Sequence, residues 1–268
     1  MFRSLRVFLL VWRLCPSEAE EAIVLLGGDL DSDRTETLFK IVHATEAMLA
    51  SEPDAGRLRA HPRLVVNILR EGSWAPDELT RRLWTGLLAS SCSIDAPDDS
   101  NQVFVDLLLH LTPAQARILN RACERALGSA PGAGNSPSAS IALDPEEMIE
   151  LIGRHDVNRS ATDLACLYNL GLIQKLFDFT TYRKVDSFDI TPTSLGLELY
   201  KHCHGSREKV EPHLVELANT HLHNFFPPPQ PLVPQPLVPQ LLVPQPLVPQ
   251  PIFLGEQSFS LAAVSSGS

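Results

Sequence analysis

The residues best suited to metal chemistry are the alternating carboxylates in the string Gly27-Gly28-Asp29-Leu30-Asp31-Ser32-Asp33. A calcium loop offers carboxylate oxygens in this pattern, and nucleotidyltransferases use Gly-Gly followed by Asp-x-Asp. However, Arg34 stands where a calcium loop needs Gly, and Lys40 stands where it needs Glu. The Gly-Gly and Asp-x-Asp pairs are closer together here than in a nucleotidyltransferase, and no predicted strand flanks them. We therefore interpret the string as an acidic turn that caps the helix after Arg34.

A second cluster with metal-ligand chemistry is rich in histidine. It comprises His202, Cys203 and His204, together with His213, His221 and His223. A structural zinc site needs paired ligands with fixed gaps at both ends, which this spacing does not provide. On a helix, the side chains of His202 and His204 point about 200° apart, so they cannot both face one ion. We interpret the cluster as a solvated helix end, and we predict neither a metal nor a cofactor.

Nucleophilic or nucleotide chemistry has no supporting motif in the chain. The patterns GxSxG, GxGxxG, HExxH and the P-loop are all absent. The five cysteines are scattered without a CxxC pair, which is typical of buried thiols in a reducing compartment. We therefore predict a cytoplasmic protein that is not an enzyme and has no catalytic, cofactor-binding or metal-binding residue. The sequence leaves open the alternative of a catalytic site assembled from residues that are far apart in the chain.

The charge balance disfavours nucleic acid as a partner. The 268 residues carry 22 Lys and Arg against 32 Asp and Glu, which gives a formal net charge of −10. Affinity for a phosphate backbone comes mainly from Lys and Arg, so a chain this acidic is poorly suited to it. With 44% apolar residues, the chain can still bury a substantial core. We expect a globular protein, and the sequence leaves its protein partner and its oligomeric state open.

Helical periodicity dominates the first half of the chain. Leu38, Ile41, Val42, Thr45 and Leu49 fall on one stripe of a helix that begins near Arg34. Further helices are predicted to begin at Pro62, at Pro76-Asp77-Glu78, at Val103 and at Thr112-Pro113. Because these segments are too apolar to be stable alone, we predict that residues 30–127 pack as a helical bundle.

Residues 1–29 precede this bundle and are predicted to form a partly ordered leader. The uninterrupted apolar run from Val7 to Trp12 is six residues long and is bounded by Arg6 and Arg13. A signal sequence needs about seven to fifteen apolar residues, and a membrane span needs about twenty. We interpret the segment as an amphipathic leader or an over-extended start. A membrane is therefore a disfavoured partner, with at most a weak peripheral contact through residues 1–15.

The pattern changes after residues 128–140, which are rich in Gly, Pro, Ala and Ser and are predicted to be a flexible linker. The predicted elements are helices over Asp144–Ile152 and Ser160–Leu170, strands over residues 172–181 and 184–191, a helix from Thr191, and a C-terminal helix over residues 207–226. When the helix over residues 112–127 is counted first, this is the order of a winged-helix unit. We therefore predict a winged-helix-like α+β module with one β-hairpin over residues 112–206, which shares that first helix with the bundle.

The chain ends in a proline-rich segment. Eleven of its 22 prolines fall between Pro227 and Pro251, and the unit Pro-Leu-Val-Pro-Gln repeats four times from Pro231 to Gln250 with one substitution. Proline this dense cannot supply the backbone donors of helices or sheets, so we predict a disordered tail over residues 227–268. The expected fold class is thus mainly α, with a bundle, a winged-helix-like module and a tail.

A winged helix can also bind DNA, because its third helix can enter the major groove. In this alternative, the protein is a transcriptional regulator whose nucleic-acid contacts are Arg159 on that helix and Arg183 and Lys184 at the wing tip. Residues 111–206, however, contain nine Lys or Arg and eleven Asp or Glu, so the module gains little from counterion release. We favour protein–protein contact as the role of this module.

Three stretches together resemble the bacterial abortive-infection alpha-like (Abi-alpha) family. They run from His61 through Glu71 and from Asp77 to Ala89, from Val103 to Leu119, and from Leu167 to Ile173 joined to Ile190–Cys203. The first is similar to the family's acidic helix start that leads to a tryptophan and Leu-Leu-Ala. The second stretch resembles the family's apolar helix followed by Leu-Ser/Thr-Pro. The third stretch resembles the family's C-terminal pattern, which contains glycine and cysteine. The resemblance covers roughly residues 30–205, and the order of the three stretches carries it.

This resemblance implies a cytoplasmic bacterial protein associated with phage resistance, and it brings no established active site. The matched residues also have structural explanations. We expect Trp84 in the core, Cys203 as a small buried residue, and Gly196 where two helices pack closely. We therefore hypothesise a non-enzymatic phage-defence protein that acts through protein–protein contacts.

Overall fold

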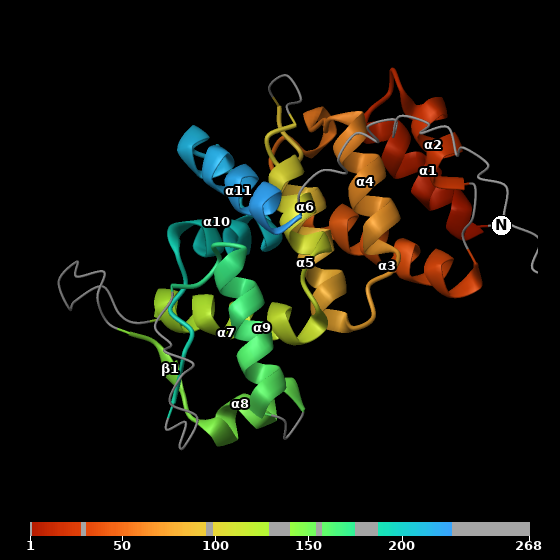
Figure 1. Cartoon of the computed structure of the whole chain (residues 1–268). Coiled ribbons are helices and arrows are strands. Elements are labelled where there is room, and N and C mark those ends of the chain that lie inside the picture. The colour runs from red at the N-terminus through yellow and green to blue at the C-terminus, as the bar shows by residue number, and fades with distance from the viewer. Residues whose placement is uncertain are drawn as a thin grey trace, which may run out of the picture. The chain divides into compact units, whose positions relative to one another are not determined.

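The computed structural model describes residues 2–27, 31–94, 99–128, 140–153, 157–174 and 187–226, which form a mainly helical protein (Figure 1). The helices are α1 (Phe2–Leu14), α2 (Ala19–Gly27), α3 (Ser32–Ala50), α4 (Pro62–Gly72), α5 (Glu78–Ser90), α6 (Gln102–Leu109), α7 (Pro113–Gly128), α8 (Pro145–Ile152), α9 (Val157–Asn169), α10 (Ser194–Cys203) and α11 (Pro212–Phe225). A 3-10 helix at Ala55–Arg57 and two strands, β1 (Ala142–Leu143) and β2 (Phe188–Asp189), complete the elements of this part of the chain. The mainly α fold is confirmed, whereas the predicted tail lies outside the described residues.

The segment predicted as a leader contributes two helices to the core. α1 buries Val7, Leu10, Val11 and Leu14 and packs against α2 and α3. These four positions follow the i, i+3, i+4, i+7 spacing of a helix face, a signal that the length of the apolar run did not capture. Within the described residues, no helix combines the length and the apolar character that a membrane span requires.

The helix starts follow the capping chemistry expected from the sequence. Asp31 caps α3 by accepting a hydrogen bond from the Arg34 amide at 2.8 Å, and Asp77 caps α5 by accepting one from the Thr80 amide at 2.9 Å. Such caps satisfy backbone donors that the first turn of a helix leaves free. The acidic turn before Arg34 is therefore a helix cap, as predicted for its described residues.

Helix α5 is the centre of the packing, because it contacts α3, α4, α7 and α10. Trp84 is 3% exposed, and Leu87 and Leu88 are fully buried beside it. The expected core position of Trp84 is confirmed. Buried apolar side chains from α1 through α11 form one continuous cluster, so the predicted bundle and the predicted module share a single core.

Two glycines allow helices to approach other backbone segments closely. A Cβ atom at Gly86 of α5 would lie 1.9 Å from the carbonyl oxygen of Cys203, at the end of α10. A Cβ atom at Gly196 of α10 would lie 2.2 Å from the carbonyl oxygen of Leu172. Gly196 does sit at a close approach, but its backbone neighbour is Leu172, in the bend after α9, and not a second helix as predicted. The tighter contact at Gly86 is an additional finding.

The strands pair differently from the simple predicted hairpin. β1 pairs with β2 in antiparallel register, with Leu143 opposite Phe188, although no strand was predicted after the linker. Two residues are too few to show the alternation that identifies a strand in a sequence. The predicted strand over residues 172–181 is described only at its start, where Ile173 forms an antiparallel bridge with Pro192. Residues 175–186 lie outside the described part of the chain.

Candidate functional site

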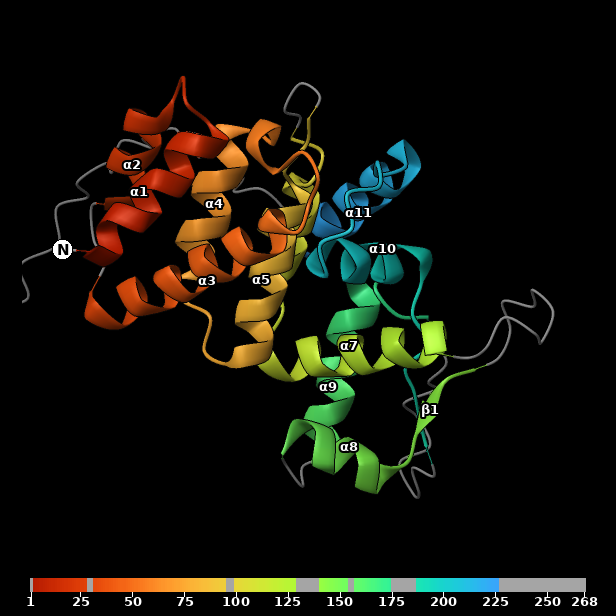
Figure 2. The ribbon, with the colours of Figure 1, turned by 180° about the vertical axis from the view of Figure 1, so that it is seen from behind.

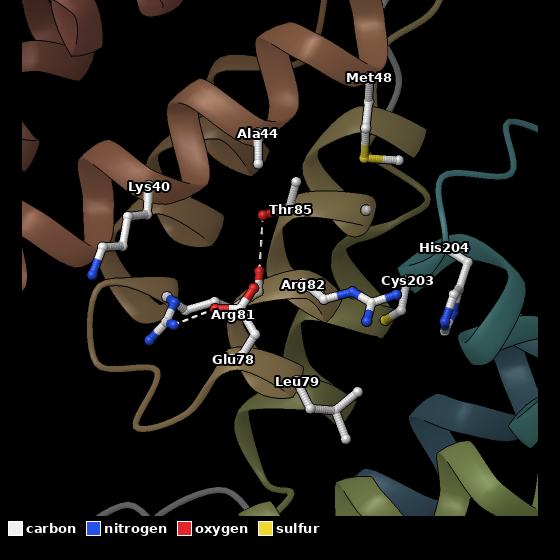
Figure 3. A pocket seen from close by; sticks show the side chains of 11 residues that line it. Lys40, Ala44, Met48, Glu78, Leu79, Arg81, Arg82, Thr85, Cys203 and His204 are labelled. Atoms are coloured by element: carbon white, nitrogen blue, oxygen red, sulfur yellow. Dashed lines mark hydrogen bonds and ion pairs between the residues drawn. The ribbon is translucent and has the colours of Figure 1, made fainter.

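A groove of about 400 Å³ opens where α3, α5 and the end of α10 meet (Figure 3). Its lining consists of Lys40, Ala44 and Met48 from α3, Glu78, Leu79, Arg81, Arg82, Thr85 and Gly86 from α5, and Cys203 and His204 at the end of α10. The charged side chains are in contact with water, since the side chain of Lys40 is 52% exposed and that of Glu78 is 72% exposed. The site is thus an open groove with a wet rim.

The first turn of α5 is anchored by Asp77, which positions the groove residues that follow it. Besides capping α5, this carboxylate accepts a hydrogen bond from the Arg117 guanidinium of α7 at 2.8 Å. Burial alone would raise the pKa of Asp77, but the Thr80 hydrogen bonds and the Arg117 charge outweigh it and hold the pKa below its usual value. The ionised carboxylate therefore ties α5 to α7 at neutral pH.

The groove lining is predominantly cationic. It contains three cations, Lys40, Arg81 and Arg82, against the single carboxylate of Glu78. Arg81 pairs with Glu78, and Lys40 pairs with Glu36 of the preceding helical turn at 2.7 Å. Arg82 is exposed, extends toward the end of α10 (Figure 3), and makes no ion pair among the described residues. Its guanidinium is therefore free to bind a carboxylate or phosphate oxygen.

The inner end of the groove is closed by the contact between α5 and α10. Cys203 lies there against Gly86 and is 3% exposed. Burial raises the pKa of the Cys203 thiol far above its usual value, with a smaller contribution from Cys123, so the thiol is protonated at neutral pH. Next to it, the exposed His204 ring stacks on Tyr200 at 3.9 Å between ring centroids and hydrogen-bonds to the carbonyl oxygen of Tyr200 at 2.8 Å.

A family model described as abortive infection alpha (Abi_alpha) matches residues 36–203. The chain belongs to the abortive infection alpha family. No curated protein and no solved structure matches the chain significantly. The family match begins within α3 and ends with α10, so it contains every groove residue except His204. The helices α1, α2 and α11 lie outside it.

The residues predicted for the DNA-binding alternative are only partly described. Arg159 lies on the exposed side of α9, near its first turn. Arg183 and Lys184 lie outside the described residues, so the structure does not show whether they join Arg159 in one surface. None of the three lines the cationic groove.

The histidine cluster is dispersed in the structure. His202 is buried and stacks on Phe104 at 4.7 Å between ring centroids, and burial lowers its pKa below the usual value. By contrast, His221 bonds to the Asn169 carbonyl oxygen through Nδ1, and His223 bonds within its own helix. Among the described residues, no three His, Cys, Asp or Glu side chains are grouped as metal ligands.

Sequence reasoning missed the groove because its lining comes from three helices that are distant in the chain. One signal was present, since Arg81 and Arg82 form an adjacent basic pair in an acidic chain. On a helix, neighbouring residues point about 100° apart, which allows both arginines to line the same rim of an open groove. This pair lies within the stretch from Asp77 to Ala89 that carries the family resemblance.

Proposed function

We propose that the protein limits phage infection by binding a partner protein at the groove between α3, α5 and α10. Family membership supports the role in abortive infection. The groove supports the mode of action, because it is open and bears cations on its rim. The observation that carries the proposal is the exposed Arg82, which extends into the groove without an ion pair in the described part of the chain.

The partner segment is proposed to be acidic and extended. Three cations against one carboxylate favour a negatively charged ligand, and an open groove accommodates a chain that passes through it. Phosphate-rich nucleic acid fits less well, since the whole chain carries a net charge of −10 and would be repelled over a long contact. An acidic loop or chain terminus of a protein requires only a short contact.

A binding role without catalysis is part of the proposal. Burial raises the pKa of all five cysteine thiols, to about 11 for Cys15 and about 12 for Cys92 and Cys123, so no thiolate nucleophile is present at neutral pH. The carboxylate of Glu78 and the ammonium of Lys40 in the groove are hydrated, whereas catalytic acids and bases are usually tuned by burial. Both observations favour recognition over a chemical step.

Charge reversal at the groove tests this proposal. In bacteria that express the protein, Arg82→Glu is expected to abolish protection, measured as the efficiency of phage plating, because it repels an acidic segment. The control is Arg63→Glu on α4, whose side chain is 62% exposed, lies outside the groove and pairs with the exposed Asp99 at 3.8 Å. Full protection by Arg82→Glu would contradict the groove. A purified protein that cleaves nucleic acid or nucleotides, with loss on a point change, would contradict the non-catalytic role.

A second candidate function is DNA binding by the region from α7 to β2. The element order α7, β1, α8, α9, β2 and the antiparallel β1–β2 pairing support a winged-helix-like arrangement, in which α9 is the third helix. Arg159 is exposed on that helix. Retention of the protein on duplex DNA at physiological salt, weakened by Arg159→Ala or by Arg183→Ala with Lys184→Ala, would favour this candidate. Absence of retention at low salt would eliminate it.

A further inference from the structure

Helix α1 has two apolar faces. One packs in the core, and the other is exposed to water. Leu5, Phe8, Leu9 and Trp12 are 53%, 38%, 53% and 46% exposed. These positions again follow the i, i+3, i+4, i+7 spacing, so the four side chains form one continuous stripe on the helix. The rings of Phe8 and Trp12 stack at 5.7 Å between centroids, which makes the stripe locally flat and aromatic.

The stripe lies where another surface can reach it. α1 is at the edge of the helical assembly in both views (Figures 1 and 2). Water-exposed apolar residues are common singly, but a contiguous stripe with two aromatic rings is typical of an interaction site. Because α1 precedes residue 36, this surface lies outside the part of the chain that matches the family.

The charge of α1 is opposite to that of the whole protein. The helix contains Arg3, Arg6 and Arg13 and no acidic residue, in a chain with a net charge of −10. Arg13 is held by the protein, since its guanidinium donates to the Ala55 carbonyl oxygen at 3.0 Å. The Arg6 side chain is 50% exposed and lies 3.7 Å from Glu46. The exposed glutamate nearest in sequence is Glu18, in the turn before α2, and Glu20 and Glu21 follow in the first turn of α2, after the C-terminal end of the stripe.

The size and chemistry of the stripe favour a lipid surface over a second protein. Its exposed side chains present about 400 Å² of apolar surface, about half of the 800 Å² that each partner buries in a stable protein–protein interface. An amphipathic helix needs only a narrow apolar stripe to insert at the boundary between headgroups and acyl chains. Tryptophan favours that depth, and arginine is attracted to anionic headgroups.

We propose that α1 docks the protein on the surface of an anionic lipid bilayer. Leu5, Phe8, Leu9 and Trp12 insert among the acyl chains nearest the headgroups, and the half-exposed Arg6, at the edge of the stripe, faces the anionic headgroups. The helix lies in the plane of the surface, because its opposite face stays packed against α2 and α3. This proposal is independent of the groove, which is formed by other helices.

Vesicle flotation with the full chain tests this docking. The protein is expected to float with vesicles of equimolar phosphatidylglycerol and phosphatidylcholine, and to float less with phosphatidylcholine alone. Replacing both Phe8→Ser and Trp12→Ser is expected to lower the bound fraction about tenfold or more. Deleting residues 1–15 is unsuitable, because it also removes Leu10, Val11 and Leu14 from the core.

The matched control replaces two exposed leucines elsewhere, Leu109→Ser and Leu127→Ser, which are 47% and 53% exposed. This control should float like the unmodified protein, and unchanged far-ultraviolet circular dichroism should show that both double variants are folded. Anionic vesicles should also shift the tryptophan emission to shorter wavelength, and Trp12→Phe should bind but lose that shift. The proposal is overturned if the unmodified protein does not float, or if the α1 double variant floats equally well. It is also overturned if the unmodified protein self-associates without floating and the α1 double variant does not self-associate.

Discussion

The contact between α5 and α10 and the outer face of α1 use helical surfaces in opposite ways. At the first, backbone meets backbone across Gly86, and Trp84 and Cys203 are almost completely removed from water. At the second, large apolar side chains remain half exposed. The first surface is already covered by another helix of the same molecule, so it contributes to the stability of the fold. The second gains free energy only when something else covers it, so the two regions should respond to substitution in different measurements.

Helix α5 has a buried side and a hydrated side, and the hydrated side lines the groove. The side of α5 that carries Leu87 and Leu88 is buried, whereas Arg81 and Arg82 lie at a hydrated rim. The tight contact with α10 therefore fixes the distance across the groove without supplying its chemistry. Substitutions in the buried contact should act mainly on stability, and substitutions at the rim should act mainly on defence.

The largest expected loss of stability comes from Gly86→Ala. The added methyl group would lie 1.9 Å from the Cys203 carbonyl oxygen, so α10 must move away from α5. We expect the free energy of unfolding to fall by about 3 kcal/mol and the Tm by about 6–12 °C. Gly56→Ala is the control, because a Cβ atom there meets nothing within 4 Å, and it should change stability by less than about 0.5 kcal/mol. Equal stability of the two variants would show that the contact is not tight.

A smaller and pH-dependent loss is expected from Asp77→Asn, which keeps the cap but removes the charge that faces Arg117. The pKa of Asp77 is lowered in the folded protein, so its ionisation stabilises the fold above the unfolded pKa of about 3.9. Urea unfolding at pH 7 should show the variant about 1 kcal/mol less stable. The difference should shrink as the pH falls below about 4 toward the lowered pKa. A difference that stays constant with pH would assign the loss to another cause.

The smallest effects on stability are expected at the two exposed surfaces. Arg82→Glu should change the free energy of unfolding by less than about 0.5 kcal/mol, because the side chain is exposed. The Phe8→Ser, Trp12→Ser pair also loses the stacking of two half-buried rings, so it should lower the free energy of unfolding by up to about 1 kcal/mol. Thermal unfolding measures this directly. If either variant lowers the free energy of unfolding as much as Gly86→Ala does, the exposed surfaces also hold the fold together, and the comparison with the buried contact fails.

Local signals in the sequence were sufficient for most helices. Asp31 and Asp77 mark helix starts through side chains that accept bonds from the next turn, and the stripe from Leu38 to Leu49 marks a buried face. Each of these signals acts over one or two helical turns, so it can be recognised without knowing the fold.

The remaining features depend on contacts between distant residues. Gly86 looks like any helical glycine until the end of α10 is placed against it, and Arg82 becomes a groove residue only beside α3 and α10. Both faces of α1 are apolar, and only packing against α2 and α3 determines that Leu10 is buried and Leu9 is exposed. The pairing of β1 with β2 likewise joins segments separated by α8 and α9.

The most direct test of a groove that binds protein is site-specific photocrosslinking in infected cells. A photoreactive phenylalanine analogue is placed at position 82 in the groove rim and, in a second protein, at position 63 on α4. The account predicts a discrete protein adduct from position 82 that appears on infection and is absent from position 63. An adduct from position 82 that consists of nucleic acid, or no adduct while protection is retained, would contradict it.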